Sequence, residues 1–203
     1  MANIALIGAS GMIGSRLLKE LSDRGHRVTG IARNPEKIAA LPGVTASKGD
    51  LFDKDGLAAL LKGHDAVISA VHYLASDPEI LLAAVRASGV KRYLVVGGAG
   101  SLFVAPGKRL VDTPEFPAIY KAEALKGADY LDRLKGVDDL DWTFLSPSAV
   151  IHPGERTGRF RLGQDTLLTN DKGSSISCED YAIAMVDEIE KPAHIRQRFT
   201  VGY

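Results

Sequence analysis

Short apolar segments alternate with longer segments of helical hydrophobic period along the whole chain. Residues 4–7 are a continuous apolar run, which is typical of a strand covered on both faces in a parallel sheet. In the segment that follows, Leu17, Leu18 and Leu21 fall on one face of a helix. Because strands and helices alternate in this way, the pattern predicts an α/β fold with a Rossmann-type, doubly wound parallel sheet.

The same pattern predicts the order of the elements. Strands are expected at residues 4–7, 27–32, 44–48, 66–70, 93–96 and 142–145. Helices are expected at residues 12–24, 34–41, 53–61, 77–89, 118–134 and 177–190. Side chains that can cap a helix stand at Asn34, Asp53 and Asp77, and Ser177 with Asp180 has the spacing of a capping box.

The last part of the chain has a weaker pattern. Residues 97–117 and 147–165 contain many glycines and prolines and are predicted to be irregular. Candidate short strands are residues 166–169, 174–176 and 198–201, the last at an edge of the sheet. We expect one domain, residues 1–203, in which residues 147–180 form a small C-terminal, substrate-facing lobe. A strand order of 3-2-1-4-5-6 would place a cleft at the carboxyl ends of the first and fourth strands.

A glycine-rich turn, Gly-Ala-Ser-Gly-Met-Ile-Gly, joins the first strand to the first helix. The first glycine allows a tight turn, the second lets the backbone approach a pyrophosphate, and the third lets the helix pack closely on the strand. Free N–H groups at the helix N-terminus would hold the phosphates. The turn therefore predicts a dinucleotide site, with a tight turn that binds nothing as the alternative. The expected contacts are Gly8, Ser10, Gly11, Met12, Ile13 and Gly14.

The end of the second strand indicates which dinucleotide binds. NAD-binding sites place an acidic residue there, on the ribose 2′-hydroxyl. No acidic residue occurs between Asp23 and Glu36, and Arg33 stands at the strand end. A guanidinium can pair bidentately with a 2′-phosphate. We therefore expect NADP(H) in preference to NAD(H), with a solvated surface arginine as the alternative.

Four motifs carry a resemblance to a known family. They are the glycine turn at residues 8–14, Val-Val-Gly-Gly-Ala-Gly-Ser at residues 95–101, Leu-Ser-Pro-Ser at residues 145–148, and Ile-Ser-Cys-Glu-Asp-Tyr-Ala at residues 176–182. Over essentially its whole length the chain resembles the atypical short-chain dehydrogenase/reductase group. Within that group it is similar to NmrA-like, NADH-flavin reductase-like and biliverdin reductase B-like NAD(P)-binding proteins. The resemblance implies cofactor binding, but the group is too diverse to imply a substrate.

The resemblance also implies roles for residues beyond the turn. An acidic residue after the third strand can contact adenine in this group, which corresponds to Asp50, and Leu51 would form part of the adenine wall. Asp50 as a helix or loop cap is the alternative. Ser69 and Ala70, at the end of the fourth strand, are expected to pass close to the cofactor. Pro147, after the sixth strand, is expected to shape the nicotinamide wall.

The catalytic residues are less well defined. The usual Tyr-x-x-x-Lys pair of short-chain reductases is absent, because no tyrosine has a lysine four residues later. Ser101 is a candidate for orienting the substrate, or else it caps a loop. Tyr120 or Lys121 is a candidate for reaching the cofactor ribose or the substrate, or Tyr120 is a packing residue. His72 follows the fourth strand, where a nicotinamide would lie, and a surface or core histidine is its alternative.

The composition excludes some classes of partner and site but adds no candidate of its own. Lys+Arg and Asp+Glu are 25 each, so the net charge gives no general attraction to nucleic acid or to an anionic membrane. Cys178 is the one cysteine, which excludes an intrachain disulfide, and its place at a helix N-terminus would lower its pKa. The histidines have no metal-ligand spacing, so no metal is expected. Without a secretory signal or an apolar run of ~20 residues, we expect a cytoplasmic monomer or homodimer.

These features together favour an NADPH-dependent oxidoreductase that passes hydride to a flavin, a quinone or a similar small acceptor. Such an acceptor can take its proton from water, which agrees with the missing Tyr-Lys pair. One alternative is a non-catalytic, NmrA-like redox sensor that binds NADP(H). A second is a sugar-nucleotide epimerase or dehydratase, which the missing pair and the small region after Pro147 disfavour.

Overall fold

The computed structural model describes all 203 residues and has one eight-stranded central sheet. Its strands are β1 (Asn3–Ile7), β2 (Arg27–Ala32), β3 (Val44–Lys48), β4 (Ala66–Ser69), β5 (Arg92–Val96), β8 (Asp141–Pro147), β10 (Arg161–Gly163) and β12 (Gln197–Gly202). The helices are α1 (Met12–Asp23), α2 (Lys54–Leu61), α3 (Pro78–Ser88), α4 (Ala118–Lys135) and α5 (Cys178–Glu190). No helix is both long and apolar enough to cross a membrane.

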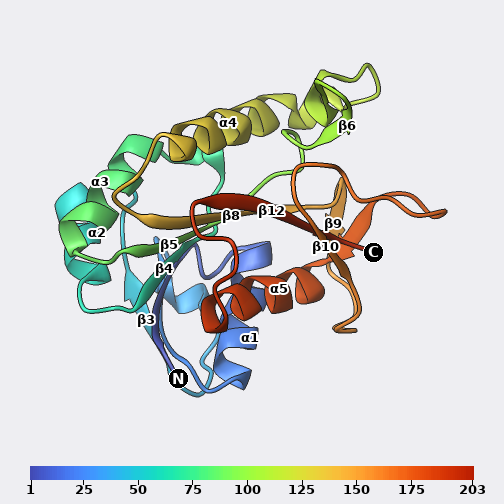
Figure 1. Cartoon of the computed structure of the whole chain (residues 1–203). Coiled ribbons are helices and arrows are strands. Elements are labelled where there is room, and N and C mark those ends of the chain that lie inside the picture. Colours follow the sequence, from blue (N-terminus) through green and yellow to red (C-terminus); the bar gives the residue numbers. More distant parts are fainter.

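The sheet has the order β10-β12-β8-β5-β4-β1-β2-β3, and every pair in it is parallel except β10 with β12. Figure 1 shows α4 on one side of this sheet and α1 with α5 on the other. One buried cluster joins the sheet to α1 and α5, and a second joins it to α2, α3 and α4. The predicted α/β class and the order 3-2-1-4-5-6 are confirmed, and the carboxyl ends of the parallel strands meet at one edge.

The region after β8 differs from the prediction. The segment predicted to be irregular contains β9 (Val150–His152) and β10, and β9 pairs with β11 (Ser175–Ser177). Residues 166–169 form no strand, and only Thr166 makes an isolated bridge, to Phe103. The last strand is not an edge strand, because β10 pairs with its outer side. With three residues, β10 is too short to produce a period in the sequence.

Two of the predicted caps differ as well. Asn34 caps nothing, and a three-residue 3-10 turn, Pro35–Lys37, replaces the predicted helix. Ser177 accepts the Asp180 N–H as expected, but Asp180 does not complete the box. Its buried carboxylate accepts the N–H groups of Thr157 and Gly158 instead, at 2.8 and 2.9 Å. For Asp180, this tertiary contact with the loop replaces the hydrogen bond within the capping box. The caps at Asp53 and Asp77 form as predicted.

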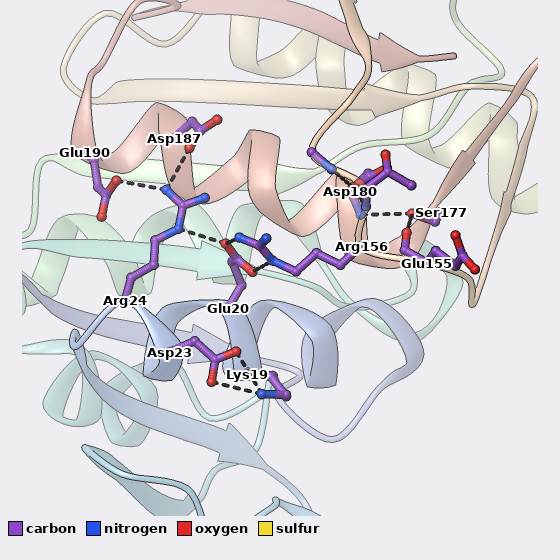
Figure 2. A network of polar contacts seen from close by, with 12 residues as sticks. Lys19, Glu20, Asp23, Arg24, Glu155, Arg156, Ser177, Asp180, Asp187 and Glu190 are labelled. Atoms are coloured by element: carbon purple, nitrogen blue, oxygen red, sulfur yellow. Dashed lines mark hydrogen bonds and ion pairs between the residues drawn. The ribbon is translucent and has the colours of Figure 1, made fainter.

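A network of charges ties α1 to α5 and to the loop before β10 (Figure 2). Glu20, on α1, is 3% exposed and accepts hydrogen bonds from Arg156 and from Arg24, all at 2.8 Å. Arg24 also contacts Asp187 and Glu190 of α5 at 2.7 and 2.8 Å. Because the carboxylate is buried and has two arginine partners, this network contributes to stability only while Glu20 is ionised.

We expect the stability of the protein to fall in acid through this network. Burial by itself would raise the pKa of Glu20, but the hydrogen bonds from Arg156 and Arg24 outweigh burial and lower the pKa below its usual 4.5. A carboxyl whose folded pKa is depressed stabilises the fold above its unfolded pKa, and this contribution is lost as pH falls through 4.5 and below. Urea unfolding of wild type and of Glu20→Gln, at pH about 7 and about 3.5, measures the effect.

At neutral pH, Glu20→Gln should lower the free energy of unfolding by about 1–3 kcal/mol. In acid, the free energies of unfolding of wild type and variant should become similar. Lys19→Gln is the control, because it breaks only the exposed pair with Asp23 and should cost at most about 0.5 kcal/mol. If the free energies of unfolding of wild type and Glu20→Gln differed by the same amount at both pH values, the role of the ionised carboxylate would be contradicted.

Candidate functional site

The glycine turn sits where α1 and the end of β4 converge on β1. Gly8 has φ +84°, and a Cβ on it would lie 2.4 Å from the carbonyl oxygen of Ala70. A Cβ on Gly14 would lie 2.0 Å from the carbonyl oxygen of Gly8. Gly8 is therefore required because the backbone of the turn lies against the backbone after β4. Gly14 is required because the backbone of α1 lies against the turn. Gly11 and Ser10, by contrast, are exposed on the outer side of the turn.

The N-terminus of α1 carries no protein cap. Gly11 is the N-cap residue, no side chain accepts from the first turn, and no acidic residue lies in it. Helices α2, α3 and α5 each begin with a side chain that accepts a backbone N–H. Met12 is half exposed and Ile13 partly buried in that first turn. Uncapped N–H groups behind an exposed glycine fit a pyrophosphate, which would complete the hydrogen bonds of the helix.

The ends of β2 and β3 add polar groups at the same edge. Arg33 is exposed and forms no ion pair. The Gly49 N–H donates to the Ala32 carbonyl at 3.1 Å, which holds the two strand ends together. Asp50 accepts the Phe52 N–H at 2.9 Å, and this turn leaves Leu51 packed against the core under α2 and α3. The predicted 2′-phosphate and adenine residues therefore lie together, beside the glycine turn. Arg16, on α1, is paired with Glu179 of α5.

The ends of β4, β5 and β8 form the other half of the cleft. Ser69 is 2% exposed and Pro147 is buried, and their places beside the cofactor stay predictions. After β5, a Cβ on Gly97 would lie 2.4 Å from the ring of Phe144, so packing requires that glycine. A Cβ on Gly98 would meet only the ring of Tyr73, at 4.0 Å. Gly98 is thus required neither by packing nor by its backbone.

Ser101 lies deeper than the predicted substrate role suggests. It is 9% exposed, and its hydroxyl accepts a hydrogen bond from Arg198 of β12 at 3.2 Å. Arg198 is also buried and pairs with Asp165 through its Nε at 2.6 Å. The Ser101 hydroxyl thus contacts a side chain of β12, and both of its roles suggested by the sequence, orienting a substrate and capping a loop, stay predictions.

The start of α4 presents the remaining candidates. Tyr120 is 63% exposed and Lys121 is exposed without an ion pair. The residue four positions before Lys121, where a Tyr-x-x-x-Lys pair would have its tyrosine, is Pro117. His72 is also exposed, and its Nδ1 lies 3.3 Å from a carboxylate oxygen of Glu123. Sequence reasoning missed Glu123, which belongs to no motif with a recognisable spacing, and it gave no role to Gly98, although Gly98 lies in the motif at residues 95–101.

Two further features lie outside the cleft. Cys178 is fully buried, and burial raises the pKa of its thiol, so the predicted lowering is wrong because desolvation outweighs the helix N-terminus. A hollow of about 280 Å³ lies beside the amino end of β12, between His194 and Phe199 and the last turns of α5. It is at the opposite end of the strand from the glycine turn and takes no part in the cleft.

Comparison with known proteins agrees with this geometry. A family model described as NAD(P)H-binding matches residues 8–192. A "putative exported protein" from Burkholderia pseudomallei is 51% identical, with each chain covered over 100% and a TM-score of 0.91. A "putative epimerase" from Bacteroides thetaiotaomicron is 44% identical over 100% of this chain and 97% of that one, with a TM-score of 0.94.

A third solved structure bears a name that specifies a reaction. This "putative NADH-flavin reductase" from Streptococcus pneumoniae is 40% identical over 100% of this chain and 99% of that one, with a TM-score of 0.82. Of the three names, one gives no activity and the other two give different activities, although all three chains share the fold. The shared fold therefore does not determine the reaction, which depends on the residues of the site.

Proposed function

Because this chain belongs to the NAD(P)H-binding family, we propose that it is an oxidoreductase that uses NADPH to reduce a flavin, a quinone or a similar small acceptor. The observation that carries the proposal is the line of groups along the strand ends: the unpaired Arg33 after β2, the uncapped N-terminus of α1 after β1, and Gly98 after β5. This order agrees with the order of the adenosine ribose, the pyrophosphate and the nicotinamide in a dinucleotide.

Each part of the cleft has a defined task in this proposal. The first turn of α1 binds the pyrophosphate, and Arg33 pairs with the 2′-phosphate. Asp50 and Leu51 bound the adenine. The nicotinamide supplies the hydride when the cofactor is bound, and the protein contributes proximity by holding the acceptor against it above Gly98.

Two other functions make different demands on the same cleft. The name of the Bacteroides relative raises an epimerase for this chain, but neither tyrosine of α4 has a lysine four residues later to form the pair that would move a proton. A redox sensor needs only the cofactor site, and the absence of a Tyr-Lys pair agrees with it. We favour the reductase because the relative from Streptococcus pneumoniae that is named a "putative NADH-flavin reductase" matches this chain over its whole length at 40% identity.

Titration of the purified protein with NADPH and with NADH tests the proposal. We expect NADPH to bind at least about tenfold more tightly, because Arg33 forms charge-assisted hydrogen bonds only with the 2′-phosphate. Riboflavin, FMN and a quinone are then added in turn while absorbance at ~340 nm is followed. Oxidation that depends on the acceptor supports the reductase. Tight binding without oxidation favours the sensor, and binding of neither cofactor contradicts the whole proposal.

A further inference from the structure

An exposed histidine and a carboxylate from a distant element meet at the edge of the cleft. The side chain of His72 is 87% exposed, and its Nδ1 lies 3.3 Å from Oε1 of Glu123, which is on α4. His72 stands two residues after Ala70, whose carbonyl lies against Gly8 of the glycine turn. The imidazole therefore lies just past the point at which β4 reaches the cofactor turn.

Glu123 is fixed by more than the histidine. Its two carboxylate oxygens accept the N–H groups of Tyr73 and Leu74, at 2.7 and 2.9 Å. These residues open the 3-10 turn η2 (Tyr73–Ala75), so an α4 side chain caps the segment that carries His72. The side chain of Tyr73 also ties the start of this turn to β5, because its hydroxyl donates to the Val96 carbonyl at 2.7 Å. The backbone of His72 and its carboxylate partner are thus held in one arrangement.

The contacts of His72 leave one ring nitrogen free. Glu123 is the one charged group in contact with the imidazole. The polar groups that follow His72 are engaged elsewhere: the Tyr73 hydroxyl donates to Val96 of β5, and the Asp77 carboxylate caps α3. On α4, Lys121 and Lys126 flank Glu123 in sequence and form no ion pair. With Nδ1 directed at the carboxylate, Nε2 carries no protein partner and is available to a ligand.

Three exposed apolar or aromatic side chains stand near this pair along η2 and α4. Leu74, Ile119 and Tyr120 are 60%, 83% and 63% exposed. Leu74 is bonded through its backbone to Glu123, and Ile119 and Tyr120 precede Glu123 by about one helical turn. Exposed apolar side chains beside a single hydrogen-bonding nitrogen fit a flat, uncharged ring with a carbonyl oxygen better than they fit a phosphorylated flavin.

We propose that His72, positioned by Glu123, donates the proton that completes the reduction of a quinone-class acceptor. This inference rests on the proposed function. When hydride and its electron pair leave the nicotinamide for the quinone, the product carries a negative charge on an oxygen. The His72 Nε2–H bond breaks and an O–H bond forms, which gives the neutral hydroquinone, and water returns a proton to the ring. The carboxylate of Glu123 stabilises the protonated imidazole before the transfer.

The test uses His72→Ala with 1,4-benzoquinone and NADPH. We expect kcat to fall about ten- to a hundredfold, with the NADPH Kd and the melting temperature unchanged, because the removed side chain is exposed. Free imidazole should restore a large part of the lost rate, since it can occupy the same open position. Glu123→Gln, which keeps an acceptor for the Tyr73 N–H, should lower kcat about tenfold and reduce the solvent deuterium isotope effect.

His64→Ala is the matched control. His64 lies at the amino end of β4, where it bonds Thr29, and free imidazole should not change the rate of that variant. Full activity of His72→Ala would overturn the role of His72, as would a loss that imidazole does not repair. If wild type binds no NADPH or oxidises it with no acceptor, the proposed function fails first and the role of His72 falls with it.

Discussion

Replacing Arg33 by aspartate is expected to lower the affinity for NADPH by two to three orders of magnitude and to leave the affinity for NADH nearly unchanged. The guanidinium is exposed, unpaired and next to the end of β3, so nothing in the protein competes for it. Losing a bidentate, charge-assisted pair costs roughly 3 kcal/mol, and a carboxylate in its place repels the 2′-phosphate as well. The affinities are measured by fluorescence titration of both cofactors.

Two variants make this result specific. Arg33→Gln removes the charge without repulsion and should fall between wild type and Arg33→Asp. Lys62→Asp makes the same change of charge at an exposed lysine after α2, far along the helix from the cleft, and should change neither affinity by more than about twofold. Equal losses for NADPH and NADH in Arg33→Asp would show that Arg33 does not contact the 2′-phosphate.

The second large effect is expected at the third glycine of the turn. The Cβ of Gly14→Ala would lie 2.0 Å from the carbonyl oxygen of Gly8, and the atoms it meets are backbone. Because neither the new Cβ nor the Gly8 carbonyl can rotate away like a flexible side chain, α1 must move away from β1. We expect this single methyl to cost about 2–4 kcal/mol of unfolding free energy and to abolish measurable cofactor binding. Thermal and urea unfolding, followed by NADPH titration, measure both effects.

Gly11→Ala separates binding from folding. Its Cβ would lie 3.3 Å from the carbonyl oxygen of Gly8, on the exposed side of the turn. We expect stability to change by less than about 1 kcal/mol, because a small shift accommodates the methyl group. NADPH affinity should nevertheless fall at least about tenfold, since that methyl group occupies the approach of the pyrophosphate. Binding that survives in Gly11→Ala would place the phosphates elsewhere.

The parts of the molecule that sequence patterns predicted are those with local causes. The alternation of strands and helices gave the six parallel strands and their order, because crossover helices leave few ways to arrange such a sheet. Asp53 and Asp77 cap their helices through bonds to residues two or three positions away. The glycine turn and Arg33 are likewise read from spacing within one βαβ unit.

The missed features depend on residues far apart in the chain. Asp180 bonds Thr157 and Gly158 instead of its own cap, and Glu123 reaches His72 from another helix. Ser101 was a candidate by its position after β5, but its hydroxyl is engaged by Arg198, which lies 97 residues away in sequence. Such contacts leave no period or motif, since the fold alone brings the partners together.

The placement of β12 inside the sheet has a consequence for how the chain folds during synthesis. Strands β1 to β5 and β8 pair in their final order among themselves, so most of the predicted nucleotide site can assemble early. β10 is synthesised before β12 yet pairs with β12 alone, and one edge of β8 stays bare until β12 arrives. A nascent chain released from the ribosome before that point therefore exposes an unpaired edge of β8, where chaperones or other chains can attach.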